Sequence, residues 1–161
     1  FIGFIKHLLP HSNLTDSVVN TISEIDNILD PPTSIACQNG TTFIVTNEGR
    51  VIQLGGALWM NIKVPNIRTV TGANKISEIS CGSSHVALLD YHGYVWTFGT
   101  NGFQDLQFLG RESVSTLHPE RIENLPPISS ITCGNNNTFC ISEDGNLWAF
   151  GNNANGQLGA D

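Results

Sequence analysis

The sequence is poor in charged residues, and above all in basic ones. Its 161 residues include 7 Lys and Arg against 14 Asp and Glu, which gives a formal net charge of −7, and only 13% of the residues are charged. No run of five or more basic residues exists, so direct binding of nucleic acid by this segment is disfavoured. Because 40% of the residues are apolar, the chain has enough apolar material for a core and too little charge for a disordered tail.

Long apolar runs are also lacking. The opening run, residues 1–10, is interrupted by Lys6 and His7 and is too short to span a bilayer, and no basic segment marks a signal peptide. The sequence therefore predicts no membrane association. The first residue is Phe1 and the last residues lie in a turn-rich stretch, so we expect a piece of a longer protein.

Motifs that carry catalytic chemistry are missing as well. The sequence has no phosphate-binding loop, no nucleophile elbow, no paired-carboxylate motif and no C-x-x-C pair. His7 and His11 have i, i+4 spacing, but Pro10 would interrupt a helix there, which disfavours a zinc site. We therefore predict no enzyme activity, no metal and no cofactor. Without a disulfide framework, a reducing intracellular compartment is favoured, either cytoplasm or nucleus.

The sequence repeats itself three times. Residues 35–55, 79–99 and 131–151 align without gaps, and the recurring Cys residues are 44 and then 52 residues apart. Each unit has a Cys, a Gly twelve residues later, a large apolar residue three further on, and a second Gly. These positions are Cys37, Cys81 and Cys133; Gly49, Gly93 and Gly145; Ile52, Trp96 and Trp148; and Gly55, Gly99 and Gly151.

Each unit is expected to consist of short strands and turns. Residues 85–90 and 94–98 are β-rich runs joined through 91–93, where Gly93 suits the positive φ of a hairpin loop. The two-residue period places Trp96 and Phe98 on one face of the sheet, and Trp148 and Phe150 likewise. With a further strand before each Cys, about four strands fit each unit, as in a propeller blade.

The predicted fold class is therefore all-β, a partial propeller of about three four-stranded blades. We divide the chain into the end of a preceding blade with a loop or short helix (1–24), a degenerate repeat (25–67), a second repeat with a long loop (68–119) and a third repeat (120–161). The recurring Cys residues are expected to be small, buried structural residues, too far apart for disulfides. Cys140 has no counterpart and is also expected to be buried.

The repeat resembles that of the regulator of chromosome condensation family. The third unit shows this in Ile131-Thr-Cys-Gly, Glu143-Asp-Gly-Asn-Leu-Trp-Ala-Phe-Gly and Asn153-Ala-Asn-Gly-Gln-Leu-Gly, and the second in Ser80-Cys-Gly-Ser-Ser-His and Gly93-Tyr-Val-Trp-Thr-Phe-Gly. The resemblance covers roughly residues 68–161. The first unit departs from it, with Gln38 in place of Gly and Ile52 in place of Trp.

The resemblance implies a propeller of usually about seven blades, which three repeats cannot close. We therefore expect the chain to form part of a longer propeller or to close by self-association. His85 stands where the family tends to carry His, and we expect it to form a hydrogen bond within its blade. His92 is expected to be a hairpin-turn residue.

Two segments allow two interpretations each. Residues 14–29 have apolar residues near helical spacing, whereas the repeat register makes residues 22–29 an outer strand after a short helix. The variable segment 101–119 is the candidate partner-contact loop, because aromatic residues beside Arg are typical of binding hot spots. Its candidate residues are Phe103, Gln104, Asp105, Phe108 and Arg111. Packing of these side chains against a neighbouring blade is the alternative.

The predicted function is protein binding by a scaffold without catalytic chemistry of its own. The resemblance implies two alternatives: guanine-nucleotide exchange on a small GTPase, which the family's founding member performs on Ran, and substrate recognition within a ubiquitin ligase. The expected partners are another protein, such as a small GTPase, and either the remainder of the propeller or a second copy.

Overall fold

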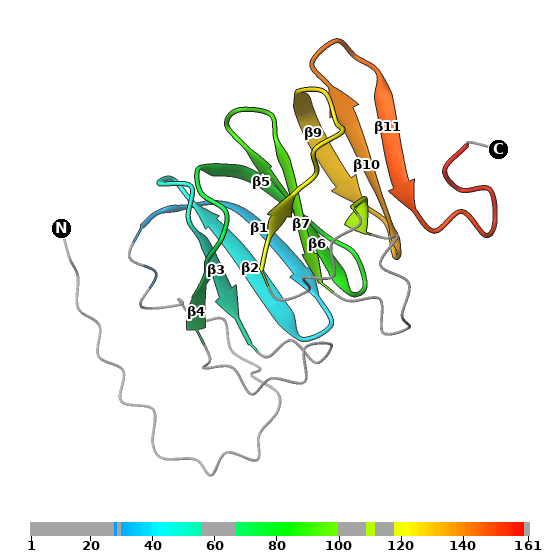
Figure 1. The fold of residues 1–161 in the computed structure, drawn as a ribbon. Helices are drawn as coiled ribbons and strands as arrows, with labels where there is room; N and C mark the ends of the chain where they lie inside the picture. The colour runs from blue at the N-terminus through cyan, green and yellow to red at the C-terminus, as the bar shows by residue number, and fades with distance from the viewer. Residues whose placement is uncertain (1–27, 29, 56–66, 100–108, 112–117, 160–161) are drawn as a thin grey trace, which may run out of the picture.

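Eleven strands form three antiparallel sheets in the computed structural model, which describes residues 28, 30–55, 67–99, 109–111 and 118–159. No α-helix is present in these residues. The sheets follow one another along the chain and lie side by side as blades (Figure 1). The first strand of blade 2 contacts the first strands of blades 1 and 3. The all-β propeller architecture predicted from the repeats is confirmed.

Blades 1 and 2 have four strands each, in sequence order. Blade 1 consists of β1 (Pro32–Gln38), β2 (Thr41–Thr46), β3 (Val51–Leu54) and β4 (Ile67–Val70); blade 2 consists of β5 (Ile76–Cys81), β6 (His85–Asp90), β7 (Val95–Gly99) and β8 (Glu120–Arg121). Blade 3 contains β9 (Ile128–Cys133), β10 (Asn137–Ser142) and β11 (Leu147–Gly151), without a fourth strand among the described residues. The degenerate first repeat therefore still forms a complete sheet.

The same turn joins the second and third strands of every blade. Gly49, Gly93 and Gly145 have φ angles of 72°, 80° and 85°, which is the left-handed region that glycine adopts without steric cost. The N–H of Gly93 donates to the carbonyl of Asp90 at 3.0 Å, and the other two turns have the equivalent bond at 2.9 Å. The positive φ expected at these glycines is confirmed. We call the end of the blades that carries these turns the turn end.

The core consists of two apolar layers, one at each joint between blades. Along β6, Val86 and Leu88 face blade 1, whereas Ala87 and Leu89 face blade 3, so the whole strand is buried. Between blades 1 and 2, the rings of Phe43 and Phe98 pack edge to face, with their centroids 5.7 Å apart. Trp96 packs in the same layer as Phe98, as the two-residue period predicts. Each blade thus covers the apolar face of the next.

The sequence allows either a helix or a short helix followed by a strand in residues 14–29. These residues lie outside the described part of the chain except for residue 28. The same holds for the rest of the N-terminal segment 1–24.

Candidate interaction surface

A buried polar contact joins blades 2 and 3. His85 Nε2 lies 2.9 Å from the hydroxyl of Thr138, and a side chain on Gly82 would collide with the imidazole, because an added Cβ would lie 2.2 Å from its Cε1. Burial lowers the pKa of His85 to about 4, so the ring is neutral at physiological pH. The sequence predicted a bond within the blade, whereas this hydrogen bond crosses to blade 3, because the side chain of His85 shares its face of β6 with Ala87 and Leu89, the face that packs on blade 3.

Further hydrogen bonds fix the register between these blades. The backbone N–H of Cys133 donates to Ser80 Oγ at 2.9 Å. Ser83 donates to the carbonyl of Asn135 through both its backbone N–H and its hydroxyl, each at 2.8 Å. Asn39 Nδ2 of blade 1 in turn donates to the carbonyl of Ser83. Polar side chains at equivalent loops therefore tie all three blades together at the end opposite the turn end.

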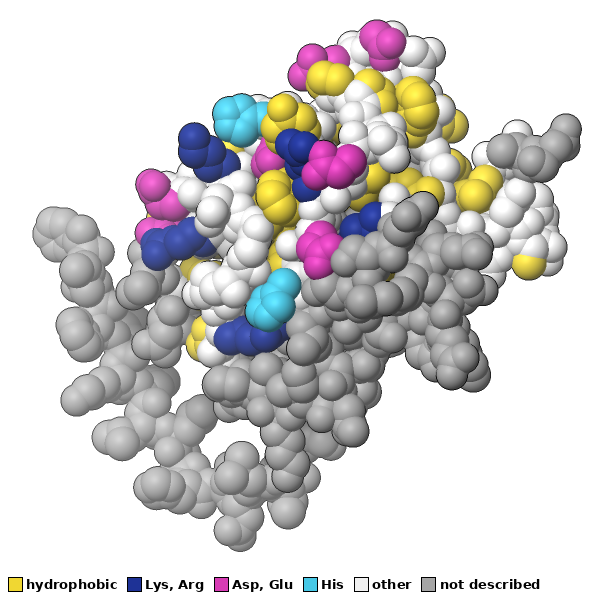
Figure 2. Space-filling view, viewed as in Figure 1, with side chains coloured by type: hydrophobic (Ala, Val, Ile, Leu, Met, Phe, Trp, Pro, Cys, Tyr) yellow, Lys and Arg dark blue, Asp and Glu magenta, His cyan; other side chains and the backbone are white. Residues whose placement is uncertain are grey.

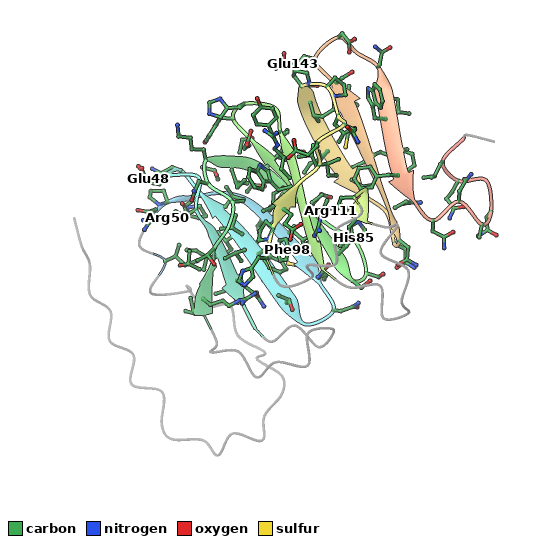
Figure 3. The ribbon with its side chains drawn as sticks, in the orientation of Figure 1. Glu48, Arg50, His85, Phe98, Arg111 and Glu143 are labelled. Carbon is green, nitrogen blue, oxygen red and sulfur yellow. The ribbon has the colours of Figure 1, made fainter. Side chains whose placement is uncertain are left out.

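Arg111 supports blade 2 from within. Its guanidinium donates to Glu120 Oε2 at 2.9 Å, to the carbonyl of Thr97 at 3.1 Å and to the Thr97 hydroxyl at 3.2 Å. Its side chain is only 6% exposed. Figure 3 labels Arg111 beside blade 2. Burial lowers the pKa of Arg111, and the nearby Glu120 carboxylate partly opposes this. The guanidinium is thus engaged inside the blade. The other candidate loop residues, Phe103, Gln104, Asp105 and Phe108, lie outside the described residues.

Blade 3 presents an apolar face that nothing in the described part of the chain covers. Ile141 is 47% exposed and Leu147 is 67% exposed. At the equivalent positions of blade 2, Leu89 and Val95 are 4% and 1% exposed, because blade 3 packs on them. The sequence positions are the same in both blades, so the difference arises because none of the described residues packs on blade 3 as blade 3 packs on blade 2.

The first strand of blade 1 shows the same effect on the opposite side. Ile35 is 63% exposed, while its equivalents Ile79 and Ile131 are 6% and 4% exposed. Cys37 is likewise exposed, whereas Cys81 and Cys133 are half-buried. The expectation of a buried residue is therefore wrong for Cys37, because none of the described residues forms a preceding blade that would pack on it. Cys140 is fully buried, as expected.

Burial keeps two of the four cysteines protonated. All four are free thiols, and burial raises the pKa of both Cys81 and Cys140 to about 12, so these two are protonated at neutral pH. Within the described ranges, no three His, Cys, Asp or Glu side chains are grouped so that they could hold a metal ion. No described helix is long and apolar enough to cross a membrane.

The chain matches known repeats in sequence. Two family models, each described as "Regulator of chromosome condensation (RCC1) repeat", match residues 76–104 and 128–157 and residues 92–141. The human probable E3 ubiquitin-protein ligase HERC4 is 31% identical over 141 residues, which covers 80% of this chain and 13% of HERC4. The zebrafish (Danio rerio) protein RCC2 homolog is 31% identical over 127 residues, covering 73% of this chain and 26% of the homolog.

Solved structures of the same kind share the fold. Yeast RCC1 (Prp20), crystallised bound to Kap60, aligns with a TM-score of 0.67 and 25% identity, over 79% of this chain and 31% of that chain. Human WBSCR16 aligns with a TM-score of 0.66 and 21% identity, over 80% of this chain and 36% of that one. The chain thus spans about a third or less of each of these proteins. The repeated sequence, the blade geometry and these matches together place the chain in the regulator of chromosome condensation (RCC1) repeat family.

Proposed function

We propose that the chain is a protein-interaction module, that it forms part of a larger propeller, and that it has no catalytic chemistry of its own. The observation that carries this proposal is the uncovered apolar face of blade 3. Ile141 and Leu147 are exposed there, whereas the residues at the equivalent positions of blade 2 are buried. Exposed apolar surface of this kind marks a site of protein contact. An intracellular location in cytoplasm or nucleus belongs to the same proposal.

The joint between blades 2 and 3 shows what would cover this face. There, the N–H of Ile128 donates to the carbonyl of Gly93 at 2.9 Å, and blade 3 packs so closely that a Cβ on Gly93 would lie 3.0 Å from Ile128 N. Blades 1 and 2 repeat this contact at Gly49. A Cβ on Gly145, the equivalent residue of blade 3, has open space around it. The turn of blade 3 is therefore shaped to receive a further sheet.

The candidate loop stays part of the proposal. The buried hydroxyl of Thr97 donates to the carbonyl of Leu109 at 2.7 Å, which joins the described residues on either side of 100–108, the segment that contains the candidate residues. Arg111 and Glu120 form an ion pair at 2.9 Å on either side of residues 112–117. A loop whose base is held by a rigid scaffold can present side chains to a partner at low entropic cost. Phe103, Gln104, Asp105 and Phe108 are the residues that we assign to this contact.

Mass measurements and binding assays on the native gene product test the proposal. Its intact mass and its mass in solution show whether further repeats, or a second copy, accompany these three blades. Cross-linking in cells followed by binding assays with the purified candidates tests the interaction. Saturable binding to a purified partner supports the proposal, and a native protein that binds none of its cross-linked candidates refutes it.

Substrate recognition in a ubiquitin ligase is a second candidate, favoured by the similarity to HERC4. The propeller would then bind substrate while a separate domain carries out ubiquitin transfer. The test is an autoubiquitination assay on the native gene product with ubiquitin-activating and ubiquitin-conjugating enzymes. Absence of a ligase domain or of transfer would reject this candidate.

Nucleotide exchange on a small GTPase is favoured by the fold and by the 25% identity shared with yeast RCC1 (Prp20). Exchange needs no catalytic nucleophile, because a loop that displaces the phosphate-binding elements of the GTPase lowers its affinity for nucleotide. The test is release of labelled GDP from a panel of small GTPases. Unchanged release in the presence of the native protein would reject this candidate.

A further inference from the structure

Blade 2 carries aromatic side chains at its turn that the turn itself does not require. Tyr91 is 60% exposed and Tyr94 is 43% exposed, and His92 lies between them in the sequence and is also exposed. The guanidinium carbon of Arg121 lies 4.5 Å from the centroid of the Tyr94 ring. We call these four residues the tyrosine patch. Figure 2 shows apolar, cationic, acidic and histidine side chains interleaved over this part of blade 2.

The other two blades act as internal controls. In blade 1 the residues equivalent to Tyr91, His92 and Tyr94 are Asn47, Glu48 and Arg50, and in blade 3 they are Glu143, Asp144 and Asn146. All three turns nevertheless have the same backbone hydrogen bonds and the same positive φ at glycine. Ordinary polar residues at these positions therefore satisfy the fold, and the backbone of the turn does not require the two exposed tyrosines.

The backbone beneath the patch is held by Asp90. One oxygen of the Asp90 carboxylate accepts from the N–H groups of His92 and Tyr94 at 2.9 and 3.0 Å, and the other accepts from Trp96 Nε1 at 2.9 Å. Glu123 holds Arg121 over the Tyr94 ring through two hydrogen bonds. A preordered surface of Tyr and Arg loses little entropy on binding, and these residue types dominate interface hot spots.

The charge around the patch indicates the kind of partner. The turn of blade 3 lies next to that of blade 2, because Pro127 accepts from the N–H of Glu143 while the adjacent Ile128 donates to Gly93. This neighbouring turn exposes Glu143 and Asp144. Figure 3 shows Glu143 at the tip of the blade 3 turn. Hydrogen bonds from Ser142 and Asn146 lower the pKa of Asp144, so that this carboxylate stays ionised.

The cations of the turn end do not neutralise this side. Arg121 is paired with Glu123, and Arg50 is paired with Asp30 on blade 1. Lys75 lies on the blade 1 side of the patch, where its carbonyl accepts from the N–H of Tyr91 at 3.0 Å. The side of the patch that faces blade 3 is therefore acidic, and the net charge of −7 adds an attraction for cations at longer range.

From this arrangement we propose that the tyrosine patch and the turn of blade 3 together bind a basic peptide segment of a partner protein. An Arg or Lys side chain of the segment lies on the exposed ring of Tyr91, and neighbouring basic residues face Glu143 and Asp144. Cation–π contact with an exposed Tyr face contributes about a two- to fivefold gain in affinity, and the carboxylates add attraction and orientation. This inference rests on the proposed interaction function and names the surface and the chemistry of its partner.

The test uses the full 161-residue chain and two fluorescent 12-residue peptides. One peptide has four Arg and two Leu in a Gly/Ser background, and the other has Glu in place of every Arg. Fluorescence anisotropy is measured at physiological ionic strength. We expect saturable binding of the basic peptide alone, about a two- to fivefold loss of affinity for Tyr91→Ala, and a smaller loss for Glu143→Gln.

Matched controls are available at the blade 1 turn. Asn47→Ala removes the side chain equivalent to Tyr91, and Glu48→Gln removes one negative charge outside the proposed site; both should leave the affinity unchanged. Equal thermal midpoints for all variants show that the fold is retained. Equal binding of the acidic peptide, no binding of the basic one, or an unaltered affinity of Tyr91→Ala would overturn the inference. Should a purified partner still bind the Tyr91→Ala variant fully, the interaction function would stand and this surface alone would be rejected.

Discussion

The turn glycine of one blade lies against the backbone of the next blade, and this contact predicts how much an alanine at that position destabilises the protein. The same substitution in blade 3, where the contact is absent among the described residues, is the control. Gly49→Ala introduces a Cβ that would lie 2.6 Å from Lys75 Cα and 2.8 Å from Ile76 N, both backbone atoms of blade 2. Gly145→Ala introduces the same methyl group at nearly the same φ, with no atom within 4 Å. The two variants share the cost of a left-handed alanine and differ only in the collision with a neighbouring blade.

The expected magnitudes follow from these two terms. A left-handed L-residue costs about 1–2 kcal/mol, so Gly145→Ala should lower the free energy of unfolding by about that amount. Overpacking against fixed backbone adds about 1–3 kcal/mol, so Gly49→Ala should lose about 2–5 kcal/mol in total. Since about 1 kcal/mol shifts the thermal midpoint of a domain of this size by about 2–4 °C, a difference of this size in the free energy of unfolding is measurable.

The assay is urea unfolding of the 161-residue chain, followed by tryptophan fluorescence. Equal losses for the two variants would refute the reasoning, because they would show that the blade contact contributes nothing. The same pair should be measured in the native gene product. If a further sheet covers blade 3 there, the cost of Gly145→Ala should rise to that of Gly49→Ala.

Three other predictions concern stability. His85 has a pKa of about 4 in the folded protein and about 6.5 in the unfolded chain, so the unfolded state binds the extra proton between these pH values. The stabilisation should be complete above pH 6.5 and should fall by about 3 kcal/mol as the pH reaches 4. His85→Gln should flatten this pH dependence in urea titrations at several pH values. Arg111→Ala removes the buried partner of Glu120 and Thr97 and should cost about 2–3 kcal/mol by the same assay. Arg111→Lys should not restore stability, because one ammonium nitrogen cannot occupy the positions of Nε, Nη1 and Nη2 at once. Val95→Ser should lower the free energy of unfolding by about 2 kcal/mol, because Val95 is buried. Leu147→Ser, at the equivalent exposed position, should change it by less than about 0.5 kcal/mol and should reduce self-association measured by light scattering. A large loss for Leu147→Ser would mean that the face of blade 3 is covered.

Much of the blade could be predicted from the sequence because the relevant rules are local. The positive φ of Gly93 follows from a hairpin loop between two β-rich runs, and the shared face of Trp96 and Phe98 follows from the two-residue period of a strand. Repetition of the pattern at residues 35–55, 79–99 and 131–151 makes these predictions mutually consistent.

The candidate site was less predictable, because it depends on contacts between blades. Arg111 could be identified as a residue worth attention, but only the fold shows its guanidinium bonded to Thr97 and Glu120. The tyrosine patch has a sequence signal, since Tyr91 stands where the other units have Asn47 and Glu143. That signal becomes informative only once the three turns are known to be identical in backbone.

The sequence by itself thus determined the repeat, the strands, the turn glycines and membership in an all-β class, because each depends on residues close together in the chain. Only the tertiary structure decided which group His85 meets, why Cys37 is exposed while Cys133 is half-buried, and which apolar face lacks a neighbour. These outcomes depend on how sheets about 50 residues apart are packed and aligned, and no local pattern encodes that alignment.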